Sequence, residues 1–151
     1  MHSARRLLRR TKLSRRAAAV VEVAIVLPIF FLIVMGIVEF GRAMMVGQLL
    51  TNGARLGARR AIVEGATNSQ VESEVTDFLT QTLNVAASDL TITIEITPAP
   101  GNPDPANNLS AAGTKDLVRL NVTVPFDKVA YAAGNFLTGT NLQGQCAMRK
   151  E

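Results

Sequence analysis

One stretch of apolar residues constrains what this chain can fold into. From Val23 to Val38 no residue is polar. With Ala17 to Val21 included, the run reaches the roughly 20 residues that an α-helix needs to cross a hydrocarbon core about 30 Å thick. The run therefore predicts one membrane-spanning helix over residues 18–40.

The charges of the chain change sign where this run begins. Seven of the 16 Lys and Arg residues precede residue 17, and all 12 acidic residues follow it, so the formal net charge of +4 combines a basic tail with an acidic remainder. Basic residues beside an apolar span hold that end in the cytoplasm. We expect residues 1–17 to be a cytoplasmic leader or stub, and residues 41–151 to form one small domain outside the cytoplasmic membrane. The tail has no interleaved aromatic residues, which argues against a nucleic-acid partner.

Two other interpretations of the N-terminus stay open. Gly41-Arg42-Ala43 places small residues where signal peptidase could act, and Ser14-Arg15-Arg16 is similar to the start of a twin-arginine signal. The apolar run is longer than a usual signal-peptide core, and the twin-arginine continuation is missing after Arg16. The pattern therefore favours a retained span.

Glu22 is the anomaly of the predicted span. A carboxylate in a membrane helix costs about 2.5–3.5 kcal/mol at the bilayer centre, and less near its edge, unless it is paired or neutralised. One explanation is that Glu22 reaches the headgroups or pairs with Arg15 or Arg16. The other is that it serves a positive group that is met only in an assembled state. A second acid, Glu39, is expected to cap the span or to pair with Arg42.

The helix is expected to continue past residue 40, because residues 41–65 contain no proline. Small or apolar residues recur there at helical spacing and predict a narrow packing seam: Ile37, Phe40, Met44, Gly47, Thr51, Ala54, Ala58 and Ala61. Gly53 with Gly57, and Ala54 with Ala58, would let another backbone approach closely. The seam could serve the chain's own sheet or a contact between subunits.

A second, shorter helix is predicted to start near residue 69. Ser69 and Glu72 have the spacing of a capping box with Ser69 as N-cap. The acids that follow, Glu72, Glu74 and Asp77, are attributed to the dipole of the first helical turn. Arg60, near the end of the long helix, is expected to pair with Glu64 four residues on.

Three strands are predicted after the second helix. Residues 90–96 and 117–124 alternate between apolar and polar side chains, and a third strand covers residues 141–149, with Cys146 as a small core residue. A proline-rich loop separates the first two strands, and a helical turn is expected between residues 126 and 136. The fold class is therefore α+β: a long N-terminal transmembrane helix that continues into a small domain with a second helix and a three-stranded antiparallel sheet.

The sequence offers no constellation for catalysis. With one cysteine and one histidine, it can form neither an internal disulfide nor a Cys/His zinc site. The glycines at 139 and 144 are followed by Gln145, where a phosphate-binding loop needs lysine. We expect a non-enzymatic protein with no cofactor, no metal and no small-molecule substrate.

The order of the basic tail, Glu22, the span and Gly36-Ile37-Val38-Glu39-Phe40-Gly41-Arg42 resembles the TadE-like family. These are minor pilins (pseudopilins) of the bacterial tight-adherence (Tad) pilus system, a branch of the type IV filament machinery. The resemblance covers about residues 15 to 63. It implies that a membrane-embedded prepilin peptidase removes the leader and that a glutamate is the fifth residue of the mature chain. Counting back from Glu22 puts the cut between Ala17 and Ala18, with Ala17 in place of the usual glycine.

This resemblance gives Glu22 a physical role. Cleavage would create an α-amino group on Ala18 with a pKa of about 8, and Glu22 of the same or a neighbouring subunit could neutralise its charge. The implied partners are prepilin peptidase, other pilins and pilus assembly proteins. The implied location is the cytoplasmic membrane, with the N-terminus inside, and then a filament for adhesion or secretion. The alternative is a single-pass, membrane-anchored periplasmic binding or scaffold protein that enters no filament.

Overall fold

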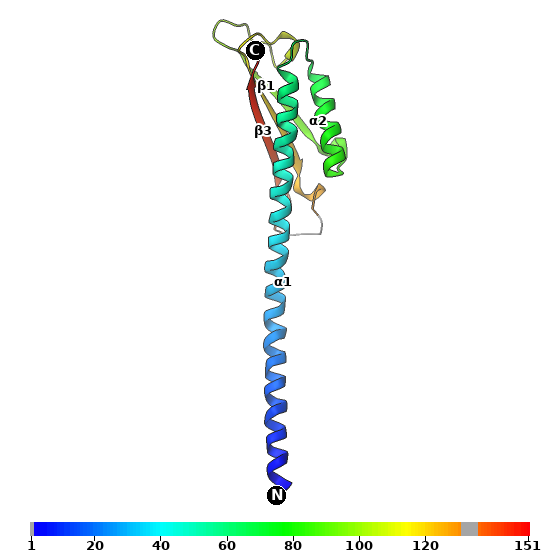
Figure 1. The fold of residues 1–151 in the computed structure, drawn as a ribbon, viewed down its shortest axis with the longest axis vertical. Helices are drawn as coiled ribbons and strands as arrows, with labels where there is room; N and C mark the ends of the chain where they lie inside the picture. Colours follow the sequence, from blue (N-terminus) through cyan, green and yellow to red (C-terminus); the bar gives the residue numbers. More distant parts are fainter. Residues whose placement is uncertain (1, 131–135) are drawn as a thin grey trace. The chain divides into compact units, whose positions relative to one another are not determined.

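The computed structural model describes residues 2–130 and 136–151, and of residues 2–16 only the backbone (Figure 1). The helices are α1 (His2–Ala61) and α2 (Asn68–Leu83), and the strands are β1 (Thr91–Thr97), β2 (Leu117–Pro125) and β3 (Asn141–Arg149). Short 3₁₀ turns lie at Ala87–Asp89, Leu109–Ala111 and Phe126–Lys128. The predicted α+β fold is confirmed, including the continuation of the long helix beyond the apolar run.

The chain divides within α1 into a helical unit, Met1–Val38, and a globular unit, Glu39–Glu151. In the helical unit the large apolar side chains from Val20 to Ile37 are between 43% and 68% exposed, except Val34, which is partly buried. By length and composition, the part of α1 from Ala17 onward contains a segment able to cross a membrane. Apolar side chains exposed round a helix are typical of a lipid-facing segment, so this unit contains a candidate membrane span.

The globular unit is built on an antiparallel sheet in the order β1-β2-β3. Figure 1 shows the upper part of α1 beside α2, with the strands behind them. Alternate residues of β2 point into the core and are fully buried: Val118, Leu120, Val122 and Val124. One face of α2 meets them, through Val71, Val75, Leu79 and Leu83. Apolar side chains recur every second residue in the strand and about every 3.6 residues in the helix, so each element has one apolar face, and the two faces meet in one core.

Helix α1 crosses β3 at very short range. A Cβ atom placed on Gly144 would overlap the backbone of Leu50 and Thr51. The neighbouring inward residues of β3, Leu142 and Cys146, are partly buried against the same core. Only glycine permits this approach of strand to helix backbone.

Two local predictions about α2 are wrong. The N-cap is Thr67, whose hydroxyl oxygen accepts the Gln70 N–H at 3.4 Å, and not Ser69. Thr67 has the extended backbone of an N-cap, whereas Ser69 already lies within the helix. The first turn contains no acid, so the first-turn dipole does not account for Glu72, Glu74 or Asp77. Sequence spacing alone could not decide between two hydroxyl residues that are two positions apart.

The loop between β1 and β2 is organised by Asp116, which is fully buried. Its Oδ1 accepts the Ala99 N–H at 2.8 Å and the Asn102 amide at 2.6 Å, and its Oδ2 accepts the Gly113 N–H at 2.7 Å. The Ala99 N–H first, then Asn102, Gly113 and the charge of Lys150, lower the pKa of Asp116 although burial opposes them. The carboxylate thereby fixes a long loop that has little regular structure of its own.

Candidate functional site

The predicted processing site lies on α1, where Ala17 and Ala18 are exposed. Glu22 is one turn further on and is also exposed. It lies beside an open, mostly apolar surface formed by Val23, Val26, Leu27 and Phe30. Among the side chains that the structure describes, from residue 17 onward, Glu22 has no ion-pair partner. Residues four apart on a helix are neighbours, so the structure puts positions 18 and 22 on one face.

The small residues of the predicted seam are buried inside the globular unit. Gly53, Ala54, Gly57 and Ala58 all face its core. A Cβ on Gly53 would lie 3.1–3.2 Å from the Leu79 side chain. A Cβ on Gly57 would lie 2.5 Å from methyl groups of Leu120 and Val75. Gly53 and Gly57 therefore let α1 pack closely against α2 and β2 of the same chain.

Before Gly47 the predicted seam does not pack on the chain's own sheet. Ile37, Phe40 and Met44 are 67%, 53% and 70% exposed. The face of α1 that the globular unit buries continues instead through Leu50, Val46 and Glu39. A contact between subunits stays a prediction for the exposed residues.

Glu39 is only 7% exposed and binds the connection between β2 and β3. Its Oε1 accepts the Leu137 N–H at 3.0 Å, and its Oε2 accepts the Phe136 N–H at 3.4 Å. One turn on, the Arg42 Nε donates to the Val129 carbonyl at 2.8 Å. The sequence predicts that Glu39 caps the span or pairs with Arg42. In the structure Glu39 binds the amides of residues 136 and 137 and Arg42 binds the Val129 carbonyl, a role that no local sequence pattern indicated.

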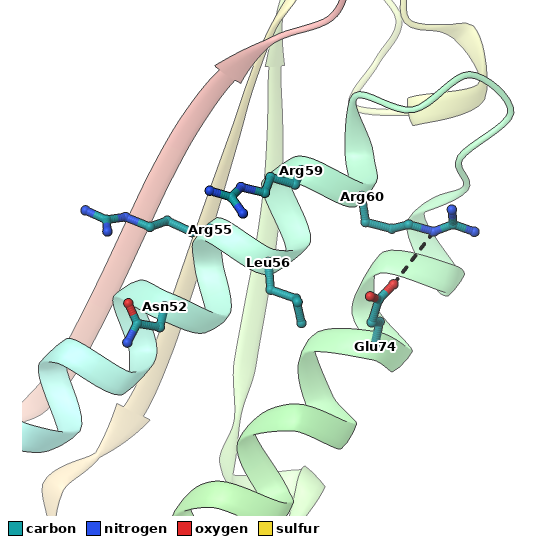
Figure 2. Close-up of a pocket in the computed structure, with 6 residues that line it drawn as sticks. All are labelled: Asn52, Arg55, Leu56, Arg59, Arg60 and Glu74. Atoms are coloured by element: carbon teal, nitrogen blue, oxygen red, sulfur yellow. Dashed lines mark ion pairs between the residues drawn. The ribbon is translucent and has the colours of Figure 1, made fainter.

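Three arginines line an open groove between the upper parts of α1 and α2 (Figure 2). Arg60 pairs with Glu74, at 3.7 Å between Nε and Oε2. The predicted partner, Glu64, is wrong because α1 ends at Ala61. Arg55 and Arg59 extend away from α2 in Figure 2, and both are exposed. Within the described residues no cluster of His, Cys, Asp or Glu could hold a metal ion.

The elements of α1 that stand out are thus an exposed glutamate on a candidate span, a clamp at Glu39 and Arg42, and a close-packed small-residue segment. Residues 17–59 match the family model of TadE-like proteins. The N-terminal part of the chain is TadE-like, as its sequence predicted. No curated protein and no solved structure matches the chain.

The TadE-like match begins at the residue before the predicted cut and includes Glu22, the Glu39–Arg42 clamp and the glycines at 53 and 57. A TadE-like segment on a candidate membrane helix fits a membrane protein associated with the Tad pilus.

Proposed function

We propose that this chain is a minor pilin. It is inserted in the cytoplasmic membrane through α1, cut by prepilin peptidase between Ala17 and Ala18, and takes part in assembling a Tad-type pilus or secretion filament. The observation that carries this proposal is the TadE-like match, which starts at Ala17 and coincides with the candidate span. In this proposal residues 1–17 are the leader, residues 18–40 the span, and residues 41–151 the outer domain.

The exposed position of Glu22 supports a role in assembly. It is a carboxylate on an apolar helix without an ion-pair partner among the described side chains. Cleavage would supply the positive charge at Ala18, either one turn away or on an adjacent copy. Removing one partner of a buried ion pair typically costs about 3–5 kcal/mol. Glu22 would therefore set the register between adjacent helices.

Three glycines of α1 support a second, intersubunit packing surface. A Cβ on Gly36, Gly41 or Gly47 would meet nothing within 4 Å, so the chain's own fold gives no reason for glycine there. Each costs about 0.8–1 kcal/mol relative to alanine in a helix. Gly36 and Gly47 are eleven residues apart and lie on one side of the helix, where they would allow close approach of another helix in a filament.

The test is the mass of the N-terminus in cells with and without the peptidase. We expect a mature chain beginning at Ala18 only when the peptidase is present, and a larger cleaved fraction for Ala17→Gly. A chain that keeps its leader beside an active peptidase would contradict the proposal. It would favour the alternative of an anchored periplasmic scaffold, for which Ala17 in place of glycine is the supporting observation.

A further inference from the structure

The charged side chains just beyond the apolar run make hydrogen bonds within the globular unit. Glu39 is 7% exposed and its carboxylate binds two loop amides. The Arg42 guanidinium binds a loop carbonyl and also approaches the Met45 sulfur at 3.5 Å. In the sequence these two residues mark the end of the apolar run. In the fold they do not interrupt the apolar outer surface of the helix.

That outer surface stays apolar for more than another turn. Phe40, Met44 and Met45 are 53%, 70% and 50% exposed. Phe136, whose N–H is bound by Glu39, is also 50% exposed. These four residues form what we call the interfacial belt. Beyond Arg42, the next charged residue of α1 is Arg55, which is exposed. The exposed polar residues before it include the amides Gln48 and Asn52.

We propose that the interfacial belt is a lipid-binding surface, which seats the globular unit in the headgroup and upper acyl region of the bilayer. Polar groups near a bilayer must find partners within the protein, and Glu39 and Arg42 do so. Their contacts with the β2–β3 connection also bring Phe136 to the level of Phe40. The clamp thus presents a second, non-helical segment to the lipid.

The length of the apolar helix agrees with this placement. The segment from Val20 to Met45 has 26 residues, more than the roughly 20 that a helix needs to cross the hydrocarbon core. The extra residues are available to extend the apolar segment into the interface or to be accommodated by tilt. Aromatic residues are favoured at this level of a membrane.

The inference rests on the membrane anchoring in the proposed function, and not on leader removal or filament entry. Its test uses single tryptophans, because the chain has none of its own. Met44→Trp and Phe136→Trp report on the belt, and Phe30→Trp on the span. Val63→Trp is the matched control, since Val63 is 47% exposed on the globular unit beyond the end of α1. Each full-length variant is reconstituted in phosphatidylcholine vesicles with or without brominated acyl chains.

We expect brominated lipid to lower the emission of Met44→Trp and Phe136→Trp by about twofold, with a blue-shifted maximum, because indole rings partition into the interface. Phe30→Trp should be quenched as well, and Val63→Trp should not. If both belt variants behave like Val63→Trp while Phe30→Trp is quenched, the belt proposal is wrong and the anchor stands. If Phe30→Trp also escapes quenching, the belt proposal and the membrane anchor are both wrong.

Discussion

The crossing of α1 over β3 gives a prediction that the geometry makes quantitative. In Gly144→Ala the new methyl group would overlap backbone atoms of Leu50 and Thr51. Backbone on both sides cannot rotate away as a side chain could, so helix and strand must separate. Overpacking a core costs about 1–3 kcal/mol, and contact with backbone puts this variant at about 3 kcal/mol. The globular unit, Glu39–Glu151, has an expected stability of about 6–17 kcal/mol at 0.05–0.15 kcal/mol per residue.

The single thiol provides the assay. Cys146 is partly buried against the core two residues from Gly144, so its modification by a thiol reagent reports the opening of β3. With a urea dependence of about 1–3 kcal/mol per M, a loss of about 3 kcal/mol lowers the midpoint by about 1–3 M. The full-length chain in detergent micelles is pulsed with reagent at increasing urea concentrations.

The matched control is Gly47→Ala. Gly47 lies in α1, about one turn before Leu50. A Cβ there meets nothing within 4 Å, so alanine should raise stability by about 0.8–1 kcal/mol through helix propensity. An unchanged midpoint for Gly144→Ala would refute the close crossing. A loss in Gly47→Ala equal to that in Gly144→Ala would show that the effect does not come from the overlap.

Three further perturbations test the contacts described above. Glu39→Ala leaves two loop amides without their acceptor and should cost about 1–3 kcal/mol; limited proteolysis should cut the β2–β3 connection sooner, and Glu39→Gln should recover part of the protection. For Asp116 the folded pKa is lowered from 3.8, so its stabilisation is complete above about pH 4 and is lost as the pH falls below it. Wild-type urea midpoints should decrease in that acidic range, whereas Asp116→Asn should be less stable at neutral pH and show a smaller decrease; an equal decrease would contradict this role. Arg60→Ala should change stability by less than about 1 kcal/mol, because Arg60 and Glu74 are both exposed, and a larger loss in thermal unfolding would show that the groove is more than a solvated face.

The strands and the long helix were predictable because their signals are local. Residues 117–124 alternate with a period of two, and β2 buries every second residue of that stretch. The apolar run and the absence of proline in residues 41–65 were enough to extend the helix beyond the span. The TadE-like pattern was visible for the same reason, since it lies within one continuous segment.

The contacts that were missed all join residues far apart in the chain. Glu39 is buried because amides at positions 136 and 137 satisfy its carboxylate, and nothing near Glu39 in the sequence indicates that. Asp116 acts on Ala99 and Asn102 across a loop. Hydropathy counts a charged residue as exposed, so it does not place Glu39 on the buried face of α1.

The most direct test of the central claim is the mass of this chain in filaments sheared from the cell surface. We predict a form that begins at Ala18 in the filament fraction of wild-type cells. Glu22→Ala should be cut as usual but remain in the membrane, because the new amine has lost its partner. A chain absent from wild-type filaments, or a Glu22→Ala variant that enters them as readily as wild type, would contradict the account.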